Sequence, residues 1–227
     1  MTIADHPVAL VEIDVGPRRV RLCTVPDLEE LVDRDALLRG DAEPPYWAYL
    51  WSGARVLAAY LARWIDLSGR RVLEIGCGLG LPGITAAALG AVTTLVDTEP
   101  MALEFVAASA AANGVSCTTV VGDFTELDSA VRFDVVVAAE VAYDRGRFEA
   151  LAAVFQRHLL PGGVGLLADG YRTDTRELYR ALANLGLETH ALDVRITEEG
   201  RPAPVRLTVI REPSERVTPR STSRPPA

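Results

Sequence analysis

The sequence predicts one α/β domain with a seven-stranded, mostly parallel sheet and helices on both faces. From residue 71 to residue 186, short runs of Val, Leu and Ile alternate with longer segments whose apolar residues recur at helical spacing. The short runs are apolar almost throughout, which is typical of parallel strands covered on both sides. Two further strand-like runs flank a tight turn near the end, so the last strand should run antiparallel.

The alternating region and the final hairpin together supply the expected seven strands. The strands are predicted over 71–76, 92–97, 117–124, 133–141, 163–170, 188–196 and 205–210. The helices between them are predicted over 81–90, 100–114, 147–160 and 175–186. Pro161-Gly162-Gly163 is expected to end the third of these helices, because proline and glycine both interrupt helical pairing.

The chain ahead of this region has its own elements. Residues 8–25 alternate as two strands around Gly16-Pro17, and residues 27–38 read as a short helix. A longer helix is expected over 53–65. We divide the chain into an N-terminal extension (1–43), the α/β domain (44–212) and a polar tail rich in Pro, Ser and Arg that we expect to be disordered (213–227).

Composition argues against several classes of function. The 227 residues, 49% of them hydrophobic, suffice for one domain with a sizeable core. The formal net charge is −8, whereas a nucleic-acid-binding domain usually has a basic surface, so we expect no nucleic-acid partner. The three cysteines lack the spacing of a disulfide framework or a zinc site, so no metal is expected. No signal peptide or membrane-spanning run is evident, which favours a cytoplasmic protein, with a monomer as the favoured state.

A glycine-rich junction follows the first strand of the alternating region: EIGCGLGLPG, from Glu74 to Gly83. Glycine lets the backbone turn sharply and approach a ligand closely, and the helix start that follows offers unpaired N–H groups. Residues 78–83 fit the G-x-G-x-x-G of dinucleotide-binding proteins. Residues 74–80 fit E-x-G-x-G-x-G, the loop that holds the methionine end of S-adenosylmethionine. A tight turn without a ligand is the third interpretation.

Acids at the ends of the next two strands favour a nucleoside cofactor. Asp97 ends the strand after the glycine loop, where an acid accepts hydrogen bonds from ribose hydroxyls. Asp123 can accept from the exocyclic amine of adenine, while Phe124 lies against the ring. The antiparallel hairpin favours methyl transfer over hydride transfer, because a two-fold dinucleotide-binding fold stays parallel.

With these features, residues 46–211 resemble the class I (seven-β-strand) S-adenosylmethionine-dependent methyltransferases. The segment PYWAYLWSGARVLAAYL and the glycine loop after it are similar to the protein-lysine methyltransferase group that includes the electron transfer flavoprotein β-subunit lysine methyltransferase. The resemblance implies a Rossmann-like fold, S-adenosylmethionine as cofactor and S-adenosylhomocysteine as product. It also implies a set of cofactor-binding residues: Trp51, Glu74, Gly76, Cys77, Gly78, Gly80, Asp97, Asp123, Phe124 and Ala139.

The segment from residue 46 to residue 51 holds four aromatic residues in six. In the resembled group, the second tryptophan of this segment lies against the cofactor, and that position is Trp51 here. Tyr46 and Trp47 would then border the substrate entry, and we expect Tyr49 in the core. Simple packing of these rings at the edge of the sheet is the alternative interpretation.

The strand over 133–141 ends in AAEVAYD, where Glu140 and Tyr143 match the family pattern Asp/Glu-x-x-Tyr/Phe. We expect Glu140 to face the substrate and hold its ammonium, and Tyr143 to orient it, which makes both candidate catalytic residues. An acid that caps the following helix is the alternative. The Asn/Asp-Pro-Pro-Tyr of base and glutamine methyltransferases is absent. Ala-Ala also replaces the Gly-Asp of the flavoprotein enzyme before the acid, so the exact substrate stays open.

The sequence therefore predicts an N-methyltransferase that acts on an amine, with a protein lysine as the first candidate. Methyl transfer to an amine is an in-line displacement at a preactivated sulfonium, so positioning supplies most of the catalysis. None of the three histidines follows a strand near the glycine loop, which argues against alcohol methylation through a histidine base. A small-molecule amine of biosynthetic metabolism and a catalytically silent cofactor-binding subunit are the alternatives.

Overall fold

A computed structural model describes residues 2–3, 5–128, 130–198 and 200–213. Seven strands form one sheet in the order β10-β11-β9-β8-β5-β6-β7. Their bounds are Arg71–Ile75 (β5), Val92–Asp97 (β6), Thr118–Val121 (β7), Phe133–Ala139 (β8), Leu159–Asp169 (β9), Glu188–Glu198 (β10) and Arg201–Arg211 (β11). In this sheet β11 pairs antiparallel with both β10 and β9, and the other six strands all run in one direction. The predicted fold class is confirmed.

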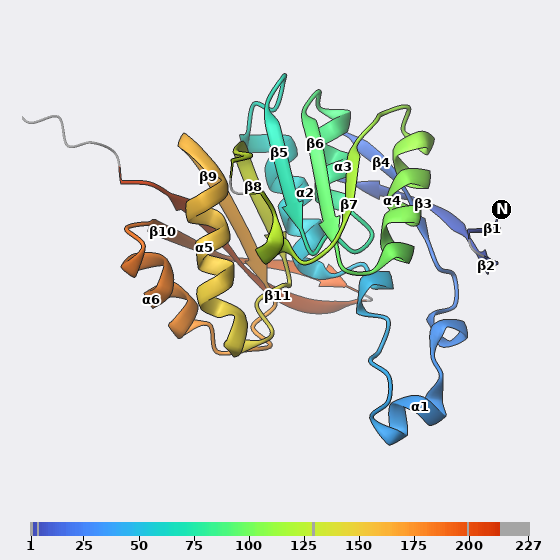
Figure 1. Ribbon diagram of the computed structural model, residues 1–227. Helices are drawn as coiled ribbons and strands as arrows, with labels where there is room; N and C mark the ends of the chain where they lie inside the picture. The colour runs from blue at the N-terminus through green and yellow to red at the C-terminus, as the bar shows by residue number, and fades with distance from the viewer. Residues whose placement is uncertain (1, 4, 129, 199, 214–227) are drawn as a thin grey trace, which may run out of the picture.

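Helices cover both faces of the sheet (Figure 1). They are α2 (Ser52–Trp64), α3 (Leu81–Ala88), α4 (Pro100–Ala112), α5 (Phe148–His158) and α6 (Arg176–Asn184). On one face, Leu57 of α2 packs in a cluster with Val137 of β8. On the other, Phe155 of α5 and Leu178 of α6 pack with Val136 of the same strand. Neighbouring valines of β8 are thus buried on opposite faces, which explains why the strand is apolar throughout.

The N-terminal hairpin shares a hydrophobic core with the α/β domain. It consists of β3 (Ala9–Asp14) and β4 (Arg19–Thr24), preceded by the short strands β1 (Thr2–Ile3) and β2 (His6–Pro7). Leu22 is fully buried in one cluster with Ile84 of α3 and Phe105 of α4. The Cys23 backbone N–H donates to Ser109 Oγ at 2.8 Å. The hairpin therefore covers the outer sides of α3 and α4 rather than forming a unit with its own core.

The segment between this hairpin and α2 projects beyond the carboxyl ends of the strands (Figure 1). The single helix expected over 27–38 is two short helices instead, the 3₁₀ helix η1 (Leu28–Leu31) and α1 (Arg34–Arg39). Asp27 caps the first, and Asp33 caps the second by accepting from the Ala36 N–H at 2.9 Å. Two capping aspartates six residues apart favour two helix starts over one continuous helix.

Two further boundaries differ from the prediction. Helix α5 ends at His158, and β9 begins at once with Leu159, so Pro161 does not end the helix. The pairing of β9 with β8 jumps from Leu159 to Val164, which leaves a bulge that accommodates the proline. The predicted disordered tail begins at residue 213, and residues 214–227 lie outside the described residues. Within the described ranges, no helix combines the length and hydropathy needed to cross a membrane.

Candidate active site

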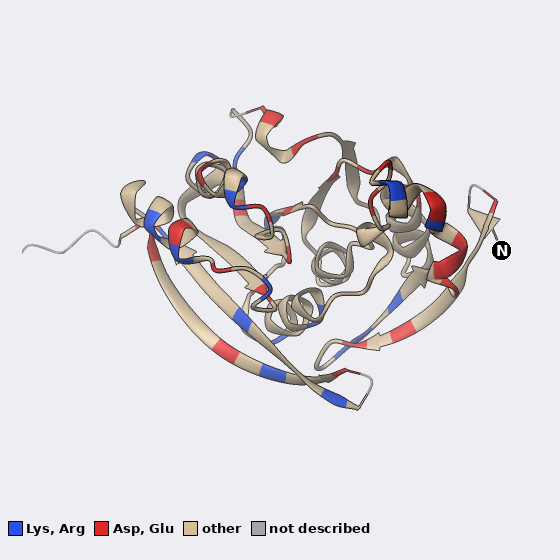
Figure 2. Cartoon of the chain, turned by 90° about the horizontal axis from the view of Figure 1, so that it is seen from below, with Lys and Arg blue, Asp and Glu red and all other residues tan. Residues whose placement is uncertain are grey.

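A cavity of about 630 Å³ opens at the carboxyl ends of the central strands. Ligands of open α/β sheets bind at this edge, and the volume falls in the range of small-molecule sites. Figure 2 is the view from below, and it shows acidic and basic residues interspersed around the molecule. The predicted site residues that line the cavity are Tyr46, Trp47, Trp51, Gly76, Cys77, Gly78, Gly80, Asp97, Phe124, Ala139, Glu140 and Tyr143. Glu74 and Asp123 do not line it.

The glycine loop needs glycine because the protein packs closely around it. Gly76, Gly78 and Gly80 have φ values of +56°, +49° and +71°, in the left-handed region that other residues rarely adopt. A β-carbon on Gly78 would lie 2.8 Å from the carbonyl oxygen of Trp47. The aromatic segment is therefore pressed against the loop, and the two together form one wall of the cavity.

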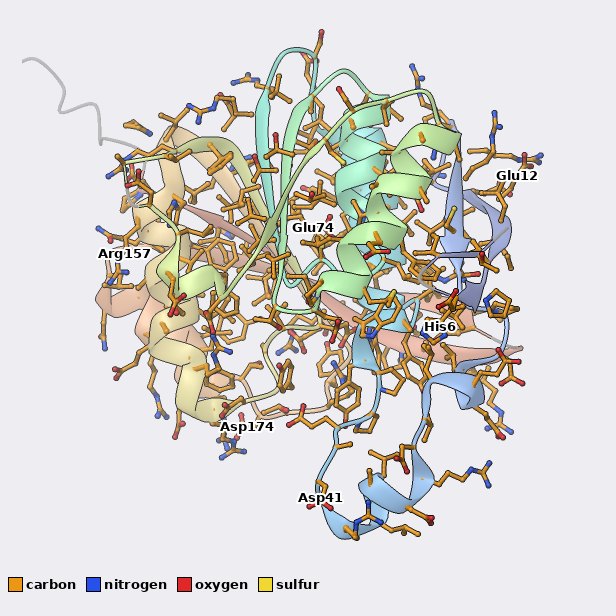
Figure 3. All side chains as sticks on the ribbon, turned by 45° about the vertical axis from the view of Figure 1, so that its right-hand side comes forward. His6, Glu12, Asp41, Glu74, Arg157 and Asp174 are labelled. Carbon is orange, nitrogen blue, oxygen red and sulfur yellow. The ribbon has the colours of Figure 1, made fainter. Side chains whose placement is uncertain are left out.

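Glu74 lies beneath this loop and not in the cavity, which corrects the direct cofactor contact that its motif implied. The side chain sits at the centre of the molecule (Figure 3), and only 1% of the residue is exposed. Its Oε2 accepts from the backbone N–H of Gly83, in the first turn of α3, at 2.7 Å. Burial raises the pKa of Glu74 to about 8, against the opposing effect of this hydrogen bond. Glu74 thus ties β5 to the start of α3.

Asp97 ends β6 and does line the cavity. One carboxylate oxygen accepts from the Gly78 N–H at 2.7 Å, and the other accepts from the Glu99 N–H at 3.0 Å. Burial raises the pKa of Asp97, while these two hydrogen bonds act in the opposite direction. Asp97 therefore fixes the glycine loop and keeps acceptor capacity in the cavity.

The next acid, Asp123, has its carboxylate engaged by another side chain. It precedes the 3₁₀ helix η3 (Phe124–Glu126), and Arg147 Nη2 lies 2.6 Å and 2.5 Å from its two oxygens. Burial alone would raise the pKa of Asp123, but hydrogen bonds from Thr125 and Arg147 lower it. The Arg147 guanidinium also lies 4.7 Å from the centre of the Phe124 ring. The carboxylate predicted to meet adenine is therefore turned toward Arg147, whereas Phe124 itself lines the cavity.

The aromatic segment forms the mouth of the cavity. It contains the 3₁₀ helix η2 (Tyr46–Ala48), whose Tyr46 carbonyl accepts from the Trp51 indole N–H at 3.0 Å. Trp47 packs against Phe105, with ring centres 5.3 Å apart. Tyr49 is 40% exposed and lies 5.4 Å from the Trp51 ring, so its predicted place in the core is wrong. An aromatic residue at a cavity rim satisfies the same local apolar pattern as a core residue, which is why the sequence did not separate them.

Glu140 lines the cavity but is almost fully buried, with 7% of the residue exposed. Its carboxylate accepts from the backbone N–H groups of Gly53 and Gly170, each at 3.1 Å. Arg172 Nη2 completes the set at 3.0 Å from Oε2. The expectation that Glu140 offers a free charge to the substrate rather than being buried is therefore wrong. Tyr143, by contrast, is 62% exposed at the rim.

Several cavity residues carry polar or aromatic groups that the sequence analysis missed. They are Glu43, Tyr49, Thr98, Glu99, Arg147 and Arg172. Arg172 follows Asp169, the last residue of β9, and so reaches the same carboxyl edge as the predicted acids. Inspecting every strand end, instead of the first four, would have identified it. Arg147 has no comparable signal, because it lies in the 3₁₀ helix η4 (Arg145–Arg147) before α5.

Comparisons with known proteins agree with this geometry. Residues 72–163 match the family model described as a methyltransferase domain. This chain therefore contains a methyltransferase domain. It is 36% identical over 129 residues to protein N-lysine methyltransferase METTL21A of Danio rerio, covering 53% of this chain and 58% of that one. It is 32% identical over 150 residues to histidine protein methyltransferase 1 homolog of Dictyostelium discoideum, covering 63% and 48%. The chain thus spans about half the length of these curated relatives.

The fold of this chain is also found among solved structures. The T. thermophilus 16S rRNA N2 G1207 methyltransferase, solved with AdoMet and guanosine, matches with a TM-score of 0.64 and 16% identity. The match covers 91% of this chain and 51% of that one, and at this identity it shows the fold alone. S-adenosylmethionine is the cofactor of the family.

The cavity fits that cofactor in its donor and acceptor groups. Asp97 supplies a carboxylate of the kind that ribose hydroxyls need. Gly122 lines the cavity, and a β-carbon there would have no atom within 4 Å, so the backbone is open to a ligand. Phe124 provides an aromatic surface beside it. A nucleoside with a short polar chain therefore matches the lining from η3 to the glycine loop.

Proposed function

We propose that this methyltransferase transfers a methyl group from S-adenosylmethionine to a nitrogen of a protein side chain, and that this side chain is a lysine. The observation that carries the proposal is the shape of the cavity, which joins the glycine loop to an aromatic mouth. Tyr46, Tyr49, Trp51 and Tyr143 all line it. The exposed rings of Tyr46, Tyr49 and Tyr143 at the rim can attract a cationic side chain, and aromatic surface accommodates its aliphatic stem. The relatives named as protein methyltransferases support a protein acceptor.

In this proposal the two ends of the cavity have separate tasks. When bound, S-adenosylmethionine supplies an electrophilic methyl group on a positively charged sulfur. Asp97 and Phe124 would hold its nucleoside, and the loop from Gly76 to Gly80 its methionine part. Trp51 would lie beside it, and Tyr143 at the rim would orient the incoming nitrogen. Glu74 and Asp123 would act indirectly, by fixing α3 and Arg147.

Positioning supplies most of the catalysis in this scheme. The acceptor nitrogen needs only to lose a proton and to lie on the line of the breaking bond, so the protein has to aim it and exclude water. Glu140 joins the start of α2, through Gly53, to the loop after β9, through Gly170. We assign it the task of holding these two walls of the acceptor side in place.

The acceptor can be identified with methyl-labelled S-adenosylmethionine in a lysate of the source cells. The purified protein and the Gly78→Val variant are incubated in parallel, and the products are separated on a gel. We expect a labelled protein band with the native protein and none with the variant, and acid hydrolysis should yield methyl-lysine. Methyl-histidine or methyl-arginine would replace the lysine proposal. Label confined to the small-molecule fraction would favour a small amine, and no label anywhere would favour a silent subunit.

A further inference from the structure

Arg172 occupies a binding site for a cation at the acceptor side of the cavity. Its guanidinium lies 4.3 Å from the centre of the Trp51 ring. Nη2 lies 3.0 Å from Oε2 of Glu140 and 3.1 Å from the Glu140 carbonyl oxygen, and Nε lies 3.2 Å from Oε2. A carboxylate, a carbonyl and an aromatic face are the groups that would hold the ammonium of an incoming lysine. Here they already hold a side chain of the protein.

The ion pair between Glu140 and Arg172 should stay formed when the acceptor enters. The Glu140 side chain is only 4% exposed, so removing Arg172 would leave a buried charge without its partner. The Arg172 side chain is 40% exposed, which leaves part of the guanidinium facing the cavity. An approaching ammonium would therefore meet a positive charge, and the negative charge behind it is already neutralised.

The loop that carries Arg172 is anchored on its other side. Tyr171 has a φ of +60°, which a residue with a side chain adopts only when its surroundings hold it. Its N–H donates to Asp169 at 3.2 Å, and its hydroxyl donates to Asp193 of β10. Arg206 of β11 lies 4.7 Å from the Tyr171 ring. These contacts fix the backbone directly ahead of Arg172, so the guanidinium is presented from a firmly held residue.

We propose that Arg172 is a positioning residue that neutralises Glu140 and makes the acceptor side selective for a nitrogen in its uncharged form. The inference rests on the proposed function, since it concerns the nitrogen that receives the methyl group. A lysine ammonium gives up its proton to solvent as it enters, because the nearby guanidinium disfavours the charged form. The nitrogen lone pair would then form the new bond to the methyl carbon while the bond from that carbon to sulfur breaks and its electron pair stays on sulfur.

The other charged groups around Glu140 and Arg172 do not undo the neutralisation of Glu140 by Arg172. Asp169, at the end of β9, faces Glu140 and Arg172, and burial raises its pKa, with repulsion from Glu140 as a further cause. Arg206 of β11 and Arg172 act on Asp169 in the opposite direction. On the α2 side, Glu198 of β10 accepts a hydrogen bond from Ser52 at 2.5 Å. Tyr143 stands at the rim.

The test compares two cofactor analogues and needs no methyl acceptor. S-adenosylhomocysteine has no charge at the reacting position, whereas sinefungin carries a primary ammonium in the place of the methyl-bearing sulfonium. Calorimetric titration at pH 7.5 gives the dissociation constant of each. In Arg172→Gln, the guanidinium is gone and the Glu140 charge is released. We therefore expect sinefungin to gain at least about tenfold in affinity relative to S-adenosylhomocysteine, which corresponds to about 1.4 kcal/mol.

Three further variants distinguish the effect of the charges of Arg172 and Glu140 from the effect of losing a side chain. Arg172→Lys keeps the charge, and its affinity ratio should stay within about threefold of the native value. The double variant Glu140→Gln/Arg172→Gln removes both charges and should return the ratio to that range. Arg176→Gln, in an exposed pair with Asp174, is the control for loss of one arginine and should leave the ratio unchanged. Thermal melting of each variant verifies that it is folded.

The outcomes distinguish this inference from the proposed function. An unchanged or smaller sinefungin preference in folded Arg172→Gln would overturn the role of Arg172. A raised preference that persists in the double variant would also overturn it, because the Glu140 charge would then not be the cause. Failure of the native protein to bind either analogue would instead contradict the proposed function itself.

Discussion

The two halves of the cavity are built in different ways. Around the glycine loop, the wall is backbone held by two acids: Glu74, buried beneath the loop, accepts from Gly83, and Asp97, which lines the cavity, accepts from Gly78. On the acceptor side, the wall is made of side chains, with Arg172 lying between Glu140 and Trp51. Substitution of a glycine in the loop adds side-chain atoms for which there is no space. On the acceptor side, replacing a single charged side chain can change the electrostatic character of the wall. The first half should therefore determine which cofactor binds, and the second which acceptor is used.

The largest effect on cofactor binding is expected for Gly78→Val in the glycine loop. The new side chain would collide with the Trp47 carbonyl and would also strain a backbone with φ of +49°. We expect titration with S-adenosylhomocysteine to show no binding. Gly186→Val is the matched control, because Gly186 also has a positive φ, +79°, but would place its β-carbon in open space. Retained binding in Gly78→Val would mean that the loop is not part of the cofactor site.

The acceptor half can be broken by removing its buried acid. Glu140→Ala leaves Arg172 and two backbone N–H groups without their acceptor. Breaking a buried pair typically costs about 3–5 kcal/mol of unfolding free energy. Asp123→Ala breaks the pair between Asp123 and Arg147. Because their side chains are 29% and 35% exposed, the loss of unfolding free energy should be about 1 kcal/mol. Urea denaturation of both variants measures the difference, and equal losses would argue against the buried pair as the anchor of this side.

The glycine-loop half should also show a pH dependence of stability that comes from Glu74. In the folded protein burial raises the pKa of Glu74 to about 8, whereas an unfolded glutamate ionises near its usual pKa of about 4.3. Between these values the unfolded state releases the proton first, so this group lowers stability as the pH rises from about 4.5 to 8. Glu74→Gln cannot ionise and keeps an acceptor oxygen for Gly83. We expect it to be more stable by about 3 kcal/mol at pH 7 and to lose most of this dependence.

Melting curves of the cofactor-free protein between pH 5 and pH 8 measure this effect. Glu104→Gln, on the exposed side of α4, is the matched control and should follow the native curve. If Glu74→Gln is less stable than the native protein at every pH, the buried carboxyl is not the source of the pH dependence.

The smallest effect is expected for Asp97→Ala. The variant loses the acceptor for ribose hydroxyls and also the bond to the Gly78 N–H, so the affinity for S-adenosylhomocysteine should fall at least about tenfold. Asp66→Ala is a suitable control, because Asp66 accepts from the Ser68 N–H in an exposed turn outside the cavity. Equal affinities in the native protein and Asp97→Ala would remove Asp97 from the cofactor site.

Much of the fold could be predicted because short sequence patterns indicate the individual strands and turns. The apolar runs of β5, β6 and β8 and the turn between β10 and β11 indicate the sheet and its antiparallel strand. The bulge in β9 could not be predicted, because the pairing with β8 absorbs a proline that usually ends an element. The shared core of the N-terminal hairpin was equally hidden, since contacts such as Leu22 with Phe105 join residues far apart in the chain.

The candidate site was predictable only as far as strand ends and glycines reveal it. Asp97 and Glu140 were found because acids at the ends of parallel strands share one edge. What they bond to was not predictable: Arg172 reaches Glu140 from 32 residues away, and Arg147 reaches Asp123 from 24. The sequence shows that a side chain is charged but does not show its partner. In the folded protein, that partner determines whether the charge is available to a ligand.

The cavity at the strand ends should bind S-adenosylmethionine rather than a dinucleotide. Titration of the native protein with S-adenosylhomocysteine and with NADH, in separate calorimetric runs, tests it most directly. We predict one binding site for S-adenosylhomocysteine, weakened in Asp97→Ala, and no heat of binding for NADH. Binding of NADH without binding of S-adenosylhomocysteine would show that the cavity is a dinucleotide site instead.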